Sequence, residues 1–95
     1  MDAILVVNNP TLQQFEVTAG ASTAALKYRL HADRIALIHT EVPEALSGRG
    51  IGAALAKTAL DYARDHHLRV IVICPFVKEY LKSHPAYQPL VINAQ

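Results

Sequence analysis

The segment Ser47-Gly48-Arg49-Gly50-Ile51-Gly52 marks the point at which the pattern of apolar residues changes from a strand period to a helical one. Three glycines in five positions permit positive φ angles and keep side chains out of the way. Backbone N–H groups of the turn and of the following helix can then point toward one anion, and Arg49 can add a charged contact. The turn therefore predicts a diphosphate site held mainly by backbone. The alternative is a turn whose glycines only permit tight packing of the helix against a strand.

The segments on either side of this turn predict a strand–helix–strand unit. Residues 35–42 alternate as a strand and stop at Pro43, which cannot donate a ladder hydrogen bond. Strand alternation puts three of their side chains on one face: Leu37, His39 and Glu41. Apolar residues then recur at helical spacing over about four turns: Ile51, Leu55, Ala59 and Tyr62. The β-branched run from Arg69 to Cys74 predicts a strand buried on both faces, parallel to the first across a right-handed crossover.

The earlier segments predict an antiparallel meander, because their connections are short. An apolar run at residues 4–7 is ended by the turn residues Asn8-Asn9-Pro10. Alternating patterns follow at residues 14–18 and 26–31. Each predicts a half-buried strand.

The last segment predicts a second helix and a short strand. Pro75 suits the first position of a helix that runs to about Ser83, and residues 90–92 suit a short last strand. The expected fold is therefore α+β, with a mixed sheet in a single domain over residues 1–95. Its order is four antiparallel strands, a crossover helix, a parallel fifth strand, a second helix and a short last strand.

Composition excludes several classes of protein. The 95 residues suffice for one domain, and the formal net charge is only +1, with the basic residues spread along the chain. We therefore expect no nucleic-acid partner. No apolar run approaches the roughly 20 residues that span a bilayer, so no membrane association is expected. The single cysteine, Cys74, cannot form an internal disulfide, which favours a cytoplasmic location.

The glycine turn resembles the acetyl-CoA signature of the GNAT superfamily of N-acetyltransferases. That signature reads Gln/Arg-x-x-Gly-x-Gly/Ala, and here it aligns as Ser47-x-x-Gly50-x-Gly52. The glycines match, whereas Ser47 stands where the family has Gln or Arg, a departure for which Arg49 could compensate. The wider pattern is similar to short single-domain GNAT-like (YjdJ-type) proteins over most of residues 4–92. Four further segments carry that likeness: residues 39–43, 60–64, 74–77 and 84–87.

This resemblance implies an N-acetyltransferase that moves an acetyl group from acetyl-CoA to an amine, without a metal. It implies a sheet splayed open beside the strand that ends at Val42, where the pantetheine arm pairs with the backbone of residues 40–42. The residues that would contact coenzyme A are Thr40, Val42, Ser47, Gly48, Arg49, Gly50, Ile51, Gly52 and Phe76.

Four residues are candidates for the chemistry of amine acetylation. Cys74 could accept the acetyl group or lie near the thioester; the alternative is a small apolar core residue. Glu41 could act as general base, and His39 could serve in its place. The alternatives are a solvated acid and a hydrogen-bonded packing residue. Tyr80 could protonate the CoA thiolate, as a tyrosine does in many GNAT enzymes, or could be an aromatic core contact.

Typical GNAT enzymes have helices between the first two strands, and this chain has no room for them. The acceptor side should therefore be shallow. It suits an exposed amine on a macromolecule, or a site completed by a second subunit, so the chain could be a monomer or a homodimer. A non-catalytic CoA-binding or interaction module is the alternative function.

Overall fold

A computed structural model describes residues 4–92 and contains one five-stranded sheet. The strands lie side by side in chain order. They are β1 (Val7–Asn9), β2 (Gln14–Ala19), β3 (Ser22–His31), β4 (Arg34–Glu41) and β5 (Arg69–Val72). The pairs from β1 to β4 are antiparallel, and β4 pairs with β5 in parallel. The predicted α+β class and mixed sheet are confirmed.

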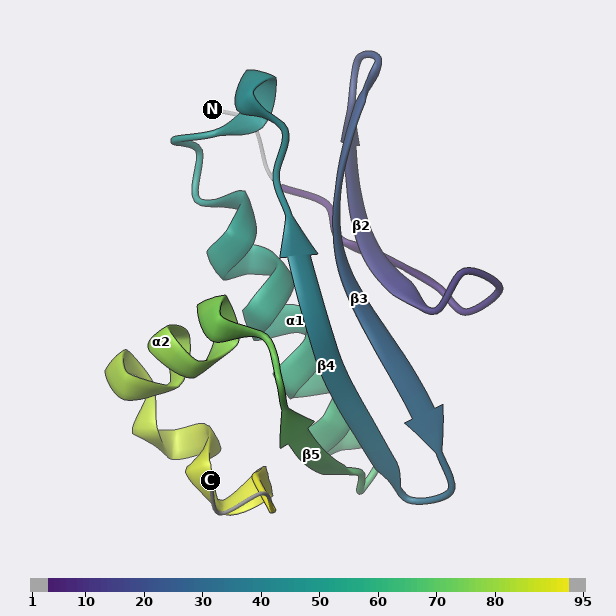
Figure 1. Cartoon of the computed structure of the whole chain (residues 1–95), viewed down its shortest axis with the longest axis vertical. Coiled ribbons are helices and arrows are strands. Elements are labelled where there is room, and N and C mark those ends of the chain that lie inside the picture. Colours follow the sequence, from purple (N-terminus) through teal and green to yellow (C-terminus); the bar gives the residue numbers. More distant parts are fainter. Residues whose placement is uncertain (1–3, 93–95) are drawn as a thin grey trace.

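The described residues also form two α-helices and two short 3-10 helices: α1 (Ile51–Asp65), α2 (Pro75–Ser83), η1 (Glu44–Leu46) and η2 (Pro85–Leu90). In Figure 1, α1 lies behind the sheet, while α2 and η2 lie beside its β5 edge. The predicted crossover helix is confirmed, and Pro75 begins α2 as expected. We call the face toward α1 the inner face and the opposite one the outer face.

The core lies between α1 and the inner face of the sheet. Leu55 and Leu60 of α1 are fully buried, and alanines between them let the helix backbone approach the strands closely. From the sheet, Leu26 and Ile35 are also fully buried. Truncating a core leucine such as Leu55 to alanine should cost about 2–5 kcal/mol.

A bulge in β4 changes which side chains share a face. Tyr28 pairs with Leu37, but the preceding Lys27 pairs with His39, so Ile38 is an extra residue in β4. Leu37 is fully buried, whereas His39 lies on the outer face opposite Lys27. The expectation that Leu37, His39 and Glu41 share one face was therefore wrong. The bulge turns Thr40 inward instead, opposite the buried Leu26.

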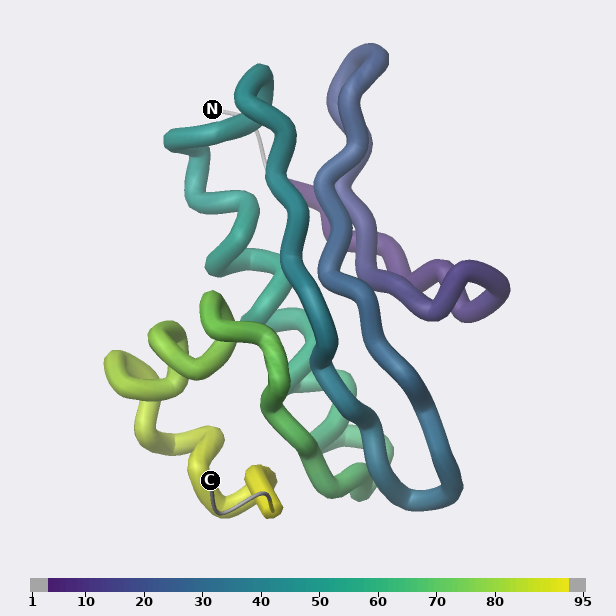
Figure 2. The backbone as a smooth tube through the Cα atoms, viewed as in Figure 1, coloured from purple at the N-terminus to yellow at the C-terminus, as the bar shows by residue number. Residues whose placement is uncertain are grey.

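Strand β5 is shorter and more exposed than the sequence predicts. The N–H groups of Ile73 and Cys74 both donate to the carbonyl of Leu37, at 3.0 and 2.9 Å, so regular pairing stops at Val72. Ile73 is 51% exposed, which corrects the prediction of a strand buried on both faces. Beyond this point β4 pairs only with β3, and Figure 2 shows the chain turning away from β4 into α2.

The two ends of the described chain also differ from expectation. Asn8 and Asn9, predicted to end the first strand, pair within it, and the Tyr28 hydroxyl donates to Asn8 Oδ1 at 2.7 Å. Side-chain hydrogen bonds thus hold turn-type residues in a strand. The expected strand at residues 90–92 is reduced to one parallel bridge between Val70 and Val91, because η2 extends to Leu90.

Candidate functional site

The glycine turn begins α1 with open backbone donors. Gly48 and Gly50 have φ of +78° and +76°, and Gly50 caps the helix through its own carbonyl, which accepts from Ala54 N at 3.0 Å. The N–H groups of the first helical turn have no partner inside a helix. No acidic residue lies in that turn, so its positive electrostatic potential is not neutralised there. The arrangement suits an anion.

Ser47 does not contribute its side chain to this group of donors. Its hydroxyl donates to the carbonyl of Glu44 at 2.9 Å, so it closes η1 instead. Arg49 is exposed and lines a hollow of about 660 Å³ beside the N-terminal strand. The hollow also has Leu5, Glu16 and Thr18 in its wall. No sequence pattern predicts this hollow, because its wall comes from three separate segments.

Gly52 allows α2 to approach the first turn of α1. A Cβ atom at Gly52 would lie 2.8 Å from Cζ of Phe76, closer than carbon atoms approach. The Phe76 ring is 43% exposed and lies against this turn. The alternative interpretation of the turn was that its glycines only permit tight packing against a strand. Gly52 does have a packing role, but the element packed against it is the helix α2. The contact between Gly52 and Phe76 brings the N-termini of α1 and α2 together. They lie beside residues 38–41 of β4, which β5 does not pair and which we call the free end of β4.

Cys74 and Thr40 meet where β4 and β5 separate. Their Sγ and Oγ1 atoms are 3.2 Å apart, and Cys74 is 1% exposed. Cys74 is the N-cap residue of α2, so the positive end of that helix faces its backbone. Val42, half-buried, follows directly after the strand end. Thr40, Val42 and Cys74 therefore surround the predicted opening.

His39 and Glu41 lie together on the outer face. His39 Nε2 is 3.5 Å from Glu41 Oε2, and both side chains are more than half exposed, at 56% and 61%. Because Cys74 is in the core, the bulge separates the predicted catalytic residues onto two faces of β4. The sequence could not reveal this separation, since simple alternation put Glu41 on the inner side with Leu37.

Tyr80 lies six residues beyond Cys74, about 1.7 helical turns or about 9 Å along α2. Its ring stacks on His84, with centroids 3.9 Å apart and an angle of 9° between the planes. Burial raises the pKa of Tyr80; the charge of Lys57 opposes this rise and that of Asp61 adds to it. The phenol therefore stays protonated at neutral pH and can donate its proton.

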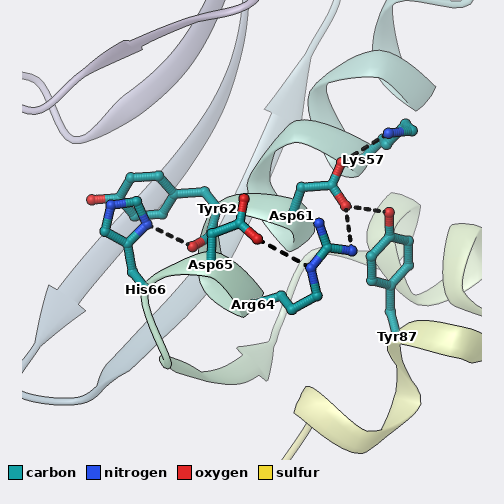
Figure 3. Close-up of polar contacts among 7 residues, drawn as sticks. All are labelled: Lys57, Asp61, Tyr62, Arg64, Asp65, His66 and Tyr87. Carbon is teal, nitrogen blue, oxygen red and sulfur yellow. Dashed lines mark hydrogen bonds and ion pairs between the residues drawn. The ribbon is translucent and has the colours of Figure 1, made fainter.

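Asp61 is the shared partner of Lys57, Arg64 and Tyr87, and we call this group the Asp61 hub. It is not among the residues predicted from the sequence. Figure 3 shows its carboxylate accepting from Lys57 Nζ at 2.8 Å and the Tyr87 hydroxyl at 2.5 Å, with Arg64 Nη1 3.3 Å away. Burial alone would raise the pKa of Asp61, but these hydrogen bonds and positive charges outweigh it and lower that pKa. The i,i+4 and i,i+3 spacing of Lys57, Asp61 and Arg64 is one that permits ion pairs on a helix, but nothing in the sequence indicates Tyr87.

Residues 4–92 hold no group of three His, Cys, Asp or Glu side chains that could bind a metal. None of the helices in this part of the chain has the length and apolar content that crossing a bilayer requires.

The mixed five-stranded sheet, the crossover helix and the open start of α1 define an α+β protein with a candidate anion site, and comparison with known proteins specifies its family. Residues 14–90 match the family model of the GCN5-related N-acetyltransferases. The chain therefore belongs to the GCN5-related N-acetyltransferase family. A GCN5-like protein from Staphylococcus aureus, solved by NMR, superposes with a TM-score of 0.74 and 26% identity, covering 100% of this chain and 94% of that one.

Similar vertebrate proteins are known as Protein NATD1. The mouse (Mus musculus) protein is 38% identical over 90 residues, which covers 92% of this chain and 82% of the relative. The bovine (Bos taurus) protein is 44% identical over 68 residues, or 70% of this chain. That match spans 60% of the bovine protein's own length.

Proposed function

We propose that this chain transfers an acetyl group from acetyl-CoA to an amine. The observation that carries the proposal is the free end of β4 beside the start of α1. Residues 38–41 of β4 have no pairing partner in β5, so their edge can pair with an extended ligand. The glycine turn lies one short 3-10 helix further along the chain. A diphosphate with an amide-bearing arm has the shape that these two features accommodate.

The residues at the turn fit coenzyme A. A Cβ atom on Gly48 or Gly50 would meet nothing within 4 Å, so a phosphate can approach the backbone there. The donors for the diphosphate would be the N–H groups of the turn and of Ile51 and Gly52. Thr40 and Val42 would pair with the pantetheine amides, and Phe76 would pack against the ligand. Ser47 would contribute only its backbone, because its hydroxyl is bound to Glu44.

Acetyl-CoA supplies an acetyl group activated as a thioester. For the amine, we assign the role of general base to Glu41, with His39 beside it as the alternative. The pair lies at the solvent, where a protein amine can reach it. Cys74 has two candidate roles, as an acetyl acceptor or as a packing residue next to the thioester. Tyr80 is the weaker candidate for proton donor to the leaving thiolate.

A second candidate function is a CoA-binding module without catalysis. It is favoured by the separation of Cys74 from the His39–Glu41 pair by the sheet. It is also favoured by the engagement of Ser47 with η1 in place of the expected longer polar side chain.

Calorimetry with acetyl-CoA, followed by CoA-release assays on a panel of peptide and small amines, tests the proposal. We expect saturable binding and turnover, with kcat/KM reduced about 100-fold or more in Glu41→Gln. Glu44→Gln is the matched control, because it removes an exposed acid from η1 and should leave turnover unchanged. If acetyl-CoA binds but wild type, Glu41→Gln and Cys74→Ala are all inactive, the binding-module function replaces the proposal. Absence of saturable binding at millimolar ligand would reject both.

The role of Cys74 has a separate test. After incubation with acetyl-CoA, mass spectrometry of the intact protein should detect an added acetyl group that is lost in Cys74→Ala if the thiol is an acceptor. Full activity in Cys74→Ala without such an adduct would assign the residue to packing.

A further inference from the structure

The register of the sheet gathers five basic residues on the lower half of its outer face. They come from β3, β4 and the start of β5, and we call them the basic face: Lys27, Arg29, His31, Arg34 and Arg69. On β3 they alternate with the inward-facing Tyr28 and its neighbours. The sequence predicted no cluster of basic residues, because they are spread along the chain. The pairing of the strands nevertheless brings these five together in space, which corrects that expectation.

One row of this face crosses three strands. Arg34 lies opposite His31 in the antiparallel pair and opposite Arg69 in the parallel pair. Adjacent strands are about 4.8 Å apart, so these three side chains are neighbours. Like charges directly opposite one another destabilise a sheet. Arg34 and Arg69 carry such like charges, so their pairing lowers stability unless an anion lies over it.

Few acids balance this charge. Asp33 lies 3.8 Å from Arg34 Nε, and its side chain is 72% exposed. Within residues 4–92, Lys27, Arg29 and Arg69 form no ion pair. The outer-face acids Glu16 and Glu41 both pair with Ala25, which is two positions from Lys27 on β3 but six from His31. Glu16 accepts from Asn9 and Gln14. In Figure 1 the outer face is turned toward the viewer, and none of the labelled helices lies over its lower half.

We propose that the basic face binds an acidic polypeptide segment. Three of its five residues are arginines, whose planar forks match carboxylates in two hydrogen bonds. Half-buried Ala36 and Ile71 lie beside Arg29, next to the row that contains Arg34, and offer apolar contact to such a segment. Sequence-tolerant binding of single-stranded nucleic acid relies on aromatic side chains for base stacking. Among the described strands, Phe15 and Tyr28 both point inward, so the outer face lacks such rings.

Binding of an acidic segment at the basic face is a function beyond acetyl transfer, and this proposal does not depend on acetyl transfer. The basic face also lies on the same side of the sheet as His39 and Glu41. Arg34 and His39 are five positions apart on β4, or roughly 16 Å in extended chain. A polypeptide bound over the row could therefore extend along β4 to the end of the strand.

A titration of the isotopically labelled chain with a 20-residue oligoglutamate peptide, followed by amide chemical shifts and without acetyl-CoA, tests the proposal. We expect saturable shifts confined to β3, β4 and β5, with affinity that falls as salt is added. The variant Arg34→Gln/Arg69→Gln should bind about tenfold more weakly. It should unfold at an unchanged or higher temperature, because it removes a like-charge pair. Arg29→Gln gives a second, milder variant should the double one fail to fold, and it should also bind more weakly.

The matched control is Lys78→Gln/Lys82→Gln on α2, which removes the same net charge from another surface. It should bind oligoglutamate as wild type does. Equal weakening in both double variants would overturn the proposal, because binding would then follow net charge alone. The absence of saturable shifts at low salt would also overturn it. Tighter binding of a 20-residue oligothymidylate than of the peptide would overturn it in favour of nucleic acid.

Discussion

The two ends of α1 are built in opposite ways. At its start, two glycines with positive φ present backbone donors, and no side chain caps the helix. Toward its end, side chains pair with one another and with the chain that follows: the Asp61 hub holds η2 through Tyr87, and His66 stacks on Tyr62 with centroids 4.0 Å apart. The open end is suited to binding a ligand and the closed end to holding the fold. Substitutions at the two ends should therefore change different properties.

Gly50→Val should have the largest effect on binding. A β-branched residue at φ +76° costs about 1–2 kcal/mol of stability and shifts the turn away from its ligand geometry. Acetyl-CoA affinity measured by calorimetry should fall at least about tenfold. Gly20→Val is the matched control, since Gly20 has φ +61° and open space around its Cβ position but lies in the β2–β3 turn. It should lose similar stability and keep its affinity. Equal loss of affinity in both variants would contradict a ligand site at the start of α1.

Asp61→Asn should lower stability without changing affinity. The substitution removes a charged acceptor shared by Lys57, Arg64 and Tyr87, so the free energy of unfolding in urea should fall by about 1–2 kcal/mol. Asp65→Asn is the control, because Asp65 is 62% exposed and pairs only with Arg64; its effect should stay below about 0.5 kcal/mol. A loss of acetyl-CoA affinity in Asp61→Asn would show that the two ends are coupled.

The stability that Asp61 contributes should disappear in acid. Its pKa is lowered in the folded protein, so the contribution is complete above the unfolded pKa of about 3.9 and is lost as pH falls through the folded pKa. Urea unfolding from pH 7 to pH 2 should show the gap between wild type and Asp61→Asn closing only below about pH 4. Tyr87→Phe lacks one hydrogen bond that lowers the pKa of Asp61. The difference in stability between Tyr87→Phe and Tyr87→Phe/Asp61→Asn should therefore close at a higher pH. A gap that is unchanged at pH 2 would exclude the charge of Asp61 as its cause.

The smallest expected effect concerns Gly52. Alanine favours a helix over glycine by up to about 1 kcal/mol, but its methyl group would displace the Phe76 ring. Gly52→Ala alone should therefore leave stability unchanged or lower it, whereas the same substitution in a Phe76→Leu background should raise it. A double-mutant cycle on urea unfolding measures the coupling, about 0.5–1 kcal/mol. Additivity within error would mean that the ring adapts freely.

Local signals in the sequence predicted most of the architecture. The helical period from Ile51 onward gave α1, Pro43 and Pro75 marked the boundaries, and the glycines located the open helix start. Each of these signals is carried by residues adjacent in sequence. The α1 and α2 predictions were therefore close to the observed bounds.

The errors arose where the structure depends on residues distant in sequence. The extra residue Ile38 has no distinctive composition, because a bulge is defined by its partner strand. That one residue moved Glu41 away from Cys74. The hydrogen bond between Tyr87 and Asp61 spans 26 positions, and the basic face joins three strands, so neither could be seen before the register was known.

The chain order of the sheet has a consequence for how the protein folds. Strands β1 to β4 pair with their immediate neighbours through short turns, so each hairpin can close within microseconds. The β4–β5 pair must wait until the loop containing all of α1 is closed, which carries a larger entropic cost. Folding kinetics should therefore show the meander protected from hydrogen exchange before β5. Residues 34–37 of β4, which precede the unpaired edge at the proposed ligand site, would then be the last part of the sheet to gain a partner.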